Sequence, residues 1–385
     1  MTQERFPTTP ETTSVATILL AGGKGTRLHE LTAAEAKPAV HFAGYNRIVD
    51  FAMANAVRSG LDKMVVATQF APKTLHAHLP RRWGGDFAPR GLVLKDGRGV
   101  YEGTADAVRR NWDVLENWDA DVVLVLAADH VYEMDYGALI RAHRASRAAV
   151  TVAVDVVPQG EASGFGVMHT RDSGIIASFH EKPANPPAIP GEPGWSMASM
   201  GIYAFDRAWL AAALAENPDA TDFGHHLIPR AVAEGAAGTF RLPPARPGAR
   251  SYWRDVGTLD ALRAAQLDFI STHPCRLPNS RPGAWRFGRD SILMPGSKLA
   301  HWVRLARTIV APGAQLPTGL VVGEDPDEDR KWFRRTEAGT VLVTQSMLDR
   351  RAELRPRLSM SSLRSASTSA LAARAMRPAM DNSNA

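Results

Sequence analysis

The sequence has one cysteine, Cys275, and no apolar run of the length that a membrane-spanning helix needs. A single cysteine excludes an internal disulfide and any metal site built from several cysteines. The N-terminal residues are polar and rich in Thr and Pro, without the apolar segment of a secretory signal. We therefore expect a disordered N-terminus over residues 1–14, a cytoplasmic location and no membrane partner.

Acidic residues are scarce at the C-terminus, which accounts for much of the basic pI of about 9.5. Residues 351–385 hold six arginines against two acidic residues, so this segment carries most of the net charge of +5. The segment is rich in Ser, Ala and Arg, a composition typical of disorder. We predict a disordered basic tail over residues 349–385. Nucleic acid is not an expected partner, although a weak contact of the tail with a polyanion stays open.

Strand-like and helix-like segments alternate between residues 15 and 272. The expected strands are 15–20, 64–68, 122–127, 150–157 and 201–205. The expected helices are 48–60, 104–118, 135–148, 207–216 and 258–271. This alternation predicts an α/β domain with a doubly wound, mostly parallel, Rossmann-like sheet covered by helices on both faces. Ligands bind such sheets beyond the carboxyl ends of the strands.

A different repeat follows a Pro-rich boundary at residues 274–282. Apolar residues recur there every six positions, with one slip of a residue: Leu293, Leu299, Leu305, Val310, Leu316 and Val322. A period of six is typical of a parallel β-helix, in which each short face contributes one inward side chain. We predict a short β-helix domain over residues 283–348, while an irregular loop with chance spacing is the alternative.

The segment that says most about function is a glycine-rich loop directly after the first expected strand. It reads Gly22-Gly23-Lys24-Gly25-Thr26-Arg27. Glycines let the backbone approach a ligand closely, bared N–H groups attract anions, and the two cations suit phosphate. The loop is neither a Walker loop, which needs an earlier glycine where Ile18 stands, nor a dinucleotide fingerprint, because Leu28 replaces the last glycine. We interpret it as a loop that holds the phosphates of a nucleotide.

Eight further segments follow this loop in a characteristic order. They are 36–42 (AKPAVHF), 101–108 (YEGTADAV), 126–130 (LAADH), 164–168 (GFGVM), 181–187 (EKPANPP), 198–203 (ASMGIY), 252–258 (YWRDVGT) and 323–326 (GEDP). With them the chain resembles the sugar-1-phosphate nucleotidyltransferases, and most specifically the bacterial ADP-glucose pyrophosphorylases (glucose-1-phosphate adenylyltransferases). The family fold is a nucleotidyltransferase domain followed by a left-handed parallel β-helix.

The resemblance implies the reaction of ATP with glucose 1-phosphate to ADP-glucose and pyrophosphate, with Mg²⁺, for glycogen synthesis. It implies that Lys24 and Arg27 neutralise the charge of the triphosphate. Lys37 would either contact a phosphate or support the glycine-rich loop. Asp129 and Asp255 would together hold the Mg²⁺, a hard cation that prefers carboxylate oxygens. As bare residues, Asp129 also suits the N-cap of the next helix, and Asp255 suits a turn or cap.

For the sugar phosphate, the resemblance implies that Lys182 binds the phosphate and Glu181 the sugar hydroxyls. It also places Gly166 and Ser199 against the sugar and Tyr101 at the substrate pocket. Three other patterns look empty. Asp222-Phe223-Gly224 lacks the catalytic loop of a kinase, and the pairs His76/His78 and His225/His226 lack partners at zinc-site spacing.

The chain departs from the family pattern in three places. Residues 87–100 are short and lack the segment that helps to seat adenine. Ala34 and Glu35 stand where regulated members carry basic residues, so we predict weak or absent activation of the usual kind, although His41 and Arg47 are kept. The short β-helix weakens the expectation of the family's homotetramer. The alternatives are a non-catalytic sugar-phosphate-binding paralogue and a pyrophosphorylase with another nucleotide preference.

Overall fold

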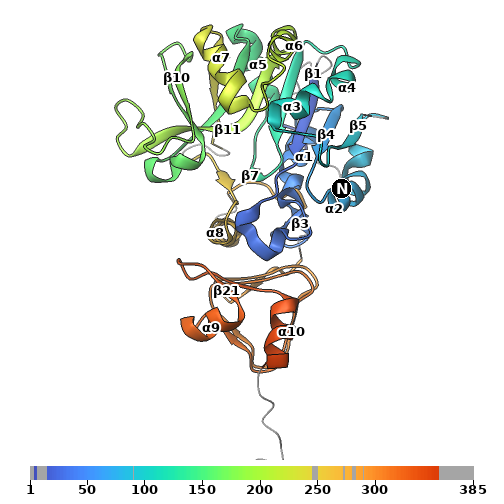
Figure 1. Cartoon of the computed structure of the whole chain (residues 1–385), viewed down its shortest axis with the longest axis vertical. Coiled ribbons are helices and arrows are strands. Elements are labelled where there is room, and N and C mark those ends of the chain that lie inside the picture. Colours follow the sequence, from blue (N-terminus) through green and yellow to red (C-terminus); the bar gives the residue numbers. More distant parts are fainter. Residues whose placement is uncertain are drawn as a thin grey trace, which may run out of the picture.

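The computed structural model describes residues 4–6, 15–89, 91–244, 250–271, 274–279, 283–288 and 290–354. Figure 1 shows a larger unit of strands and helices above a smaller unit built mostly from short strands. The predictions for residues 1–3, 7–14 and 355–385 lie outside the described residues. No helix in the described ranges is both long and apolar enough to cross a membrane.

The core of the larger unit is a nine-stranded sheet. Its main path runs β10-β9-β11-β6-β1-β4-β5, and β8 joins β11 to β12. The strands are β1 (Val15–Ala21), β4 (Met64–Thr68), β5 (Leu92–Asp96), β6 (Val122–Ala127), β8 (Val150–Pro158), β9 (Gly166–Thr170), β10 (Ile176–Glu181), β11 (Trp195–Asp206) and β12 (Ala237–Arg241).

Parallel pairing dominates around the glycine-rich loop and antiparallel pairing around the long strand β11. β1 lies between β4 and β6, parallel to both, with Leu19 opposite Val66 and Leu126. β11 runs antiparallel to β6, β8 and β9. The predicted α/β class is therefore confirmed, with a sheet that is mixed rather than uniformly parallel. β1 and β6 end at the same edge, which places the loop beside Asp129.

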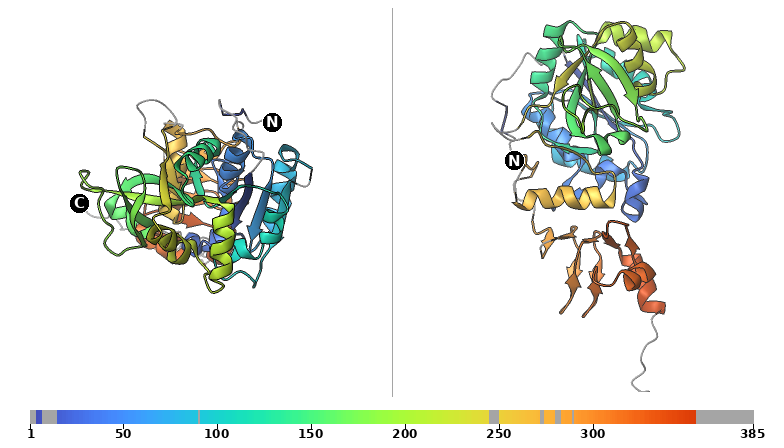
Figure 2. Two further views of the ribbon diagram at one scale, coloured as in Figure 1. Left: turned by 90° about the horizontal axis from the view of Figure 1, so that it is seen from above. Right: turned by 90° about the vertical axis from the view of Figure 1, so that its left-hand side faces the viewer.

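Helices cover both faces of this sheet (Figure 2). They are α1 (Val49–Arg58), α2 (Lys73–Trp83), α3 (Thr104–Arg109), α4 (Trp112–Glu116), α5 (Tyr136–Ser146), α6 (Arg207–Glu216), α7 (Ile228–Ala233) and α8 (Leu259–Ser271). The alternation of buried residues in the strands produces two apolar clusters, because neighbouring side chains point to opposite faces. The predicted helix 104–118 is in fact two helices, since the chain leaves helical geometry at Asn111 (φ −112°, ψ 15°).

Short helices and strands lie in the segments that connect the main strands and helices. They are η2 (Thr26–Thr32), η3 (Lys37–Ala39), β2 (His41–Phe42), β3 (Asn46–Arg47), η4 (Gly84–Asp86), β7 (His130–Tyr132), η5 (Gln159–Gly164), η6 (Phe223–Leu227) and β13 (Trp253–Asp255). β7 and β13 pair with each other, so that Asp255 lies opposite His130. This pairing joins two segments that are far apart in the sequence.

The smaller unit confirms the predicted β-helix. Its elements are β14 (Arg286–Phe287), β15 (Ser291–Leu293), β16 (Lys298–Leu299), β17 (Arg304–Leu305), β18 (Thr308–Val310), β19 (Gln315–Leu316), β20 (Val321–Val322), α9 (Pro326–Trp332), β21 (Arg334–Arg335), β22 (Val341–Val343) and α10 (Gln345–Leu354). Three parallel stacks, β15-β18-β22, β16-β19 and β17-β20, form the faces. The six-residue repeat points inward, and its second coil is fully buried at Val310, Leu316 and Val322.

Two segments at the ends of the chain differ from expectation. α10 continues to Leu354, so residues 349–354 are helical rather than part of a disordered tail; Met347 and Leu348 anchor this helix in the apolar cluster of the β-helix. At the other end, the Phe6 amide donates a hydrogen bond to the Arg58 carbonyl at 3.0 Å. Side-chain packing and backbone pairing thus order residues that composition alone assigns to disorder.

The buried repeat predicts the effect of opening the β-helix core. Leu316→Ala should lower the free energy of unfolding by about 2–5 kcal/mol, because Leu316 is only 2% exposed and its loss leaves a cavity. Leu299→Ala is the matched control, since Leu299 is the partner of Leu316 in register but is only partly buried. Urea unfolding of the full chain measures both, and an equal loss in the two variants would contradict this account of the core.

Candidate active site

The glycine-rich loop leaves the end of β1 and folds back against the Lys37 segment. Gly25 has a φ of 63°, and a Cβ built there would lie 2.6 Å from the Lys37 Cβ, so both backbone and space require glycine. The Lys37 amide donates to the Gly23 carbonyl at 3.3 Å, and the Thr32 hydroxyl donates to the Gly25 carbonyl at 2.8 Å. The loop is therefore held from both sides.

A cavity of about 380 Å³ opens beside this loop, at the carboxyl ends of β1, β4 and β6. It is lined by Leu20, Gly22, Gly23, Pro38, Ala67, Gln69, Tyr101, Gly103, Thr104, Ala107, Ala127, Asp129, Glu181, Gly201, Tyr203, Asp222, Phe223 and Gly224. Five predicted site residues are among them: Gly22, Gly23, Tyr101, Asp129 and Glu181. The structure thus brings the glycine-rich loop and the Glu181 motif to one cavity.

The two predicted metal-binding aspartates converge on a single ammonium group. Lys37 Nζ lies 3.0 Å from Asp129 Oδ2 and 2.7 Å from Asp255 Oδ1. Lys37 itself is buried, whereas both aspartates are partly exposed, and Asp129 lines the cavity. From the sequence, Lys37 could either contact a phosphate or support the glycine-rich loop. Its contacts with the two carboxylates were not predicted, because no pattern in the sequence pairs residue 37 with 129 and 255.

The charges around Lys37 stabilise one another. Burial by itself would lower the pKa of Lys37, but Asp129 and Asp255 outweigh it and raise the pKa above its usual value. Burial would raise the pKa of Asp129, but His130 and Lys37 oppose this and lower the pKa below its usual range. The cluster therefore holds a protonated lysine and an ionised aspartate at neutral pH.

The two cations predicted to meet phosphates lie on the open side of the loop. The Arg27 side chain is 68% exposed, and its Nη2 lies 3.7 Å from Asp255 Oδ2. Lys24 Nζ lies 5.6 Å from the centre of the Phe70 ring. Thr26 begins η2 directly after Gly25. Lys24, Gly25, Thr26 and Arg27 are not among the lining residues of the cavity, and the exposure of Arg27 leaves it accessible to an anion.

The Glu181 side chain packs closely against two glycines, Gly166 and Gly224. A Cβ built on Gly166 would lie 3.0 Å from Glu181 Oε2, and one built on Gly224 would lie 2.3 Å from the same atom. The absence of side chains at both positions lets the carboxylate reach the cavity. Its other oxygen, Oε1, accepts a hydrogen bond from Lys182 Nζ at 2.8 Å. The predicted pair of Glu181 and Lys182 is therefore in direct contact.

The remaining predicted sugar residues occupy different positions. Lys182 is exposed at the end of β10, in the left-handed region with a φ of 44°, and its amide donates to the Phe165 carbonyl at 3.0 Å. Ser199 is buried in β11, and its hydroxyl accepts from the Gly201 amide at 3.3 Å. The Tyr101 hydroxyl accepts a hydrogen bond from Asn111 Nδ2 at 2.8 Å. Lys182, Ser199 and Gly166 do not line the cavity.

The motif Asp222-Phe223-Gly224, which looked empty in the sequence, lines the cavity. Asp222 caps η6, a π-helical turn, by accepting hydrogen bonds from the Gly224 and His225 amides, and its other oxygen accepts from the Thr104 hydroxyl at 3.0 Å. Gly224 is the residue that makes room for Glu181. The motif was set aside because the catalytic loop of a kinase is missing, and nothing else in the sequence links residue 222 to residue 181.

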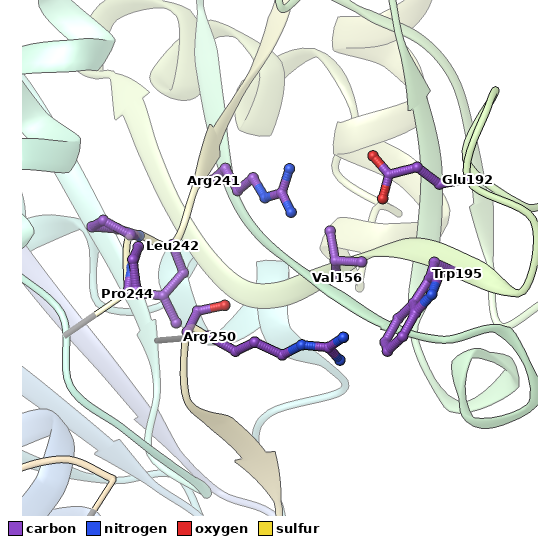
Figure 3. Close-up of a pocket in the computed structure, with 9 residues that line it drawn as sticks. Val156, Glu192, Trp195, Arg241, Leu242, Pro244 and Arg250 are labelled. Carbon is purple, nitrogen blue, oxygen red and sulfur yellow. The ribbon is translucent and has the colours of Figure 1, made fainter. Parts of the chain in front are cut away.

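A second cavity, of about 500 Å³, lies near the ends of β8 and β12. Figure 3 shows Arg241 and Glu192 across its opening from Arg250 and Trp195. The Arg250 guanidinium lies 4.6 Å from the centre of the Trp195 ring. This cavity contains none of the predicted site residues, and it shares no lining residue with the first.

The positions linked to activation in regulated relatives are joined to each other. Glu35 Oε2 lies 3.4 Å from Arg47 Nη1, and this arginine also donates to the Ala39 carbonyl. Burial raises the pKa of Glu35, although Arg47 opposes the shift. Glu35 thus engages one of the two basic residues that the sequence retains in this region. Weak activation stays a prediction.

Two family models match the chain. Residues 16–272 match the family described as Nucleotidyl transferase, and residues 285–343 match the one described as GlmU-like, C-terminal hexapeptide. The first match covers more than half of the sequence. The chain belongs to the nucleotidyl transferase family, with a C-terminal hexapeptide domain of left-handed β-helix type.

Comparison with individual proteins indicates the family within the nucleotidyl transferases. Three relatives bear the name glucose-1-phosphate adenylyltransferase. One from Cereibacter sphaeroides is 38% identical, with 89% of this chain and 97% of that protein aligned. Those from a Jannaschia species and from Granulibacter bethesdensis are 38% and 37% identical, with 87% and 88% of this chain and 96% and 97% of theirs aligned. Within the nucleotidyl transferases, the chain belongs to the glucose-1-phosphate adenylyltransferase family.

The Lys37 cluster predicts a pH-dependent loss of stability. Lys37→Met should reduce the free energy of unfolding by about 3 kcal/mol at neutral pH, because two carboxylates lose their shared partner. The pKa of Asp129 is lowered in the folded protein, so its contribution is present above pH ~4 and is lost as the pH falls further. The defect should therefore shrink in acid. Urea titrations between pH 3 and pH 7 measure this.

Lys24→Met is the control, because Lys24 lies in the adjoining glycine-rich loop, is exposed and has its ammonium 5.6 Å from the centre of the Phe70 ring. It should change stability by less than about 1 kcal/mol. A Lys37→Met protein as stable as wild type at pH 7 would show that the bridge contributes nothing.

Proposed function

We propose that this protein transfers AMP from ATP to glucose 1-phosphate, giving ADP-glucose and pyrophosphate for glycogen synthesis. One observation carries the proposal: Asp129 and Asp255 converge on the Lys37 ammonium beside the glycine-rich loop, and Asp129 lines a cavity that Glu181 also lines. A nucleotidyl transfer needs a place for a nucleotide, a place for a sugar phosphate and a cationic centre between them. The names of the relatives support the choice of ATP and glucose 1-phosphate.

The reaction asks mainly for positioning. A phosphate oxygen of glucose 1-phosphate forms a bond with the α-phosphorus of ATP, and the bond from that phosphorus to the bridging oxygen of pyrophosphate breaks. Few protons move, so the protein must bring two anions together and offset their charge. In this proposal Gly22, Gly23, Gly25 and Thr26 bind the triphosphate through their backbone, and Lys24 and Arg27 neutralise it.

The two aspartates fit a Mg²⁺ ion. Their oxygens already converge on one cation, the Lys37 ammonium, and Mg²⁺ in such enzymes takes one or two carboxylates with substrate phosphates and water as the other ligands. Among the described residues no group of three or more His, Cys, Asp or Glu side chains forms a metal site. When bound, Mg²⁺ offsets the charge that develops on the phosphates.

On the sugar side, Glu181 accepts hydrogen bonds from the hydroxyls, and Lys182 binds the phosphate. Gly166 and Gly224 support this by leaving room for the Glu181 carboxylate. In the proposal Tyr101 and Ser199 complete the substrate site. The 62% exposure of the Lys182 side chain supports its role, because an incoming anion can reach the ammonium even though it is paired with Glu181.

The setting of this activity follows from the family. We propose a cytoplasmic enzyme that forms homo-oligomers, with weaker association than in relatives because the β-helix is short. Size-exclusion chromatography with light scattering measures the assembly.

A nucleotide screen tests the function. Release of pyrophosphate is followed with glucose 1-phosphate, Mg²⁺ and each of ATP, UTP, GTP and dTTP. ATP should give the highest kcat/KM, even though residues 87–100 lack the usual adenine segment. A preference for another nucleotide would make the protein a sister pyrophosphorylase. Folded protein without turnover on any nucleotide would instead favour a binding role.

Asp129→Asn should depress turnover far more than affinity. The carboxylate offsets charge chiefly in the transition state, so kcat should fall by about 10²–10³-fold while the KM for glucose 1-phosphate changes little. Steady-state pyrophosphate release measures both constants. Asp135→Asn is the control, because Asp135 caps α5 and accepts a hydrogen bond from the Gly137 amide. An effect confined to KM would reject the proposed role of Asp129.

Lys182→Ala should act in the opposite sense. Loss of a charged hydrogen bond to the sugar phosphate should raise the KM for glucose 1-phosphate by about 10- to 100-fold and change kcat less. The same assay at varied glucose 1-phosphate measures this. Lys298→Ala, an exposed lysine in the β-helix, controls for the general loss of a positive charge. A normal KM in Lys182→Ala would place the phosphate elsewhere.

A further inference from the structure

The hexapeptide domain packs directly beneath the loops that carry the proposed active-site residues. Along one face of the β-helix, Ile292, Ile309 and Leu342 stack in register. They belong to the same buried apolar cluster as Leu28, Val131 and Val256. These last three residues adjoin Arg27, the Asp129-His130 segment and Asp255 in the chain. This face of the β-helix thus packs against the segments that carry the proposed site residues.

The hairpin 334–343, which contains β21 and β22, adds polar contacts to two segments of the catalytic domain, η2 and α8. Arg334 Nε and Nη2 donate to the two oxygens of Glu30 at 2.7 and 2.6 Å. Thr336 donates to Asp260 Oδ1 at 2.9 Å, and Arg263 donates to the Thr340 hydroxyl at 3.0 Å. Glu30 lies in η2 with Arg27, whereas Asp260 and Arg263 lie in α8, which begins shortly after Asp255.

The segment that Arg334 holds is strained. His29 is a non-glycine residue with a φ of 53° and a ψ of −122°, and it breaks η2 between Arg27 and Glu30. Such a conformation is unfavourable for a residue with a side chain and persists only where the surroundings impose it. Leu28 and Leu31 are buried on either side of the kink, and the bidentate pair with Arg334 holds the residue after it. The buried leucines and the ion pair therefore hold both sides of the kink, and Arg27 lies two residues before it.

We propose that Arg334 of the hexapeptide domain, through Glu30, is a positioning residue for the nucleotidyl transfer because it sets the place of Arg27. Both partners are partly exposed, so the ion pair adds little to global stability. Its value is geometric, since a planar guanidinium on two carboxylate oxygens fixes orientation as well as distance. The inference rests on the proposed function of the site and extends it to the second domain.

The experiment compares Arg334→Gln and Glu30→Gln in the full chain with wild type. Each should lower kcat by about tenfold, because a small displacement of a charge-stabilising group is costly, while the KM for glucose 1-phosphate changes less than about twofold. The charge-swapped double variant, Glu30→Arg with Arg334→Glu, should recover most of kcat. In an Arg27→Ala background, Arg334→Gln should have no further effect on kcat.

Arg304→Gln is the matched control, because Arg304 pairs with Glu324 at 3.0 Å within the same domain and on exposed surface. It should leave kcat unchanged. Normal kcat in Arg334→Gln, or an equal loss in the Arg27→Ala background, would overturn the proposal.

A readout without substrates separates this inference from the proposed function. Amide hydrogen exchange over residues 26–32 should be faster in Arg334→Gln and Glu30→Gln than in wild type, and unchanged in Arg304→Gln. If wild type shows no turnover but the exchange result holds, the activity is wrong and the positioning contact stands. If exchange over 26–32 is the same in all four proteins, the positioning contact is wrong whatever the activity.

Discussion

The site depends on one interaction, the sharing of the Lys37 ammonium between Asp129 and Asp255. Two carboxylates this close would repel each other without a cation between them. Lys37 reaches them from η3, and the glycine-rich loop packs over its side chain at Gly25. The loop, the end of β6 and the end of β13 are therefore held together by a single buried charge, before any substrate contributes its own.

Much of this could be predicted from the sequence because the signals are local. The apolar runs at 64–68 and 122–127 coincide with β4 and β6, since buried parallel strands are almost continuously apolar. The six-residue repeat predicted the β-helix because each coil buries one side chain per face, which leaves a periodic signal in the sequence. Gly25 and Asp129 could be selected as candidates because a glycine turn and a carboxylate after a buried strand are typical of ligand sites.

The parts that escaped prediction are contacts between segments far apart in the chain. Lys37 meets its aspartates only because β7 and β13 pair, and neither strand is long enough to leave a pattern in the sequence. Gly224 makes room for Glu181 through a π-helical turn that has no simple signature. The helix α10 was missed for a related reason: Met347 and Leu348 become buried only when the β-helix provides a surface.

The β-helix presents three faces, and one of them packs against the catalytic domain. The stack β15-β18-β22 shares its outer apolar residues with the catalytic domain, whereas β16-β19 and β17-β20 form the other two faces. Trp302, 83% exposed, sits at the corner between them. Residues on those two faces are separated from the proposed reaction centre by the interior of the β-helix, so substitutions there lie far from the site. Surface properties of the molecule can therefore diverge there while the geometry that aligns the reactants stays constant.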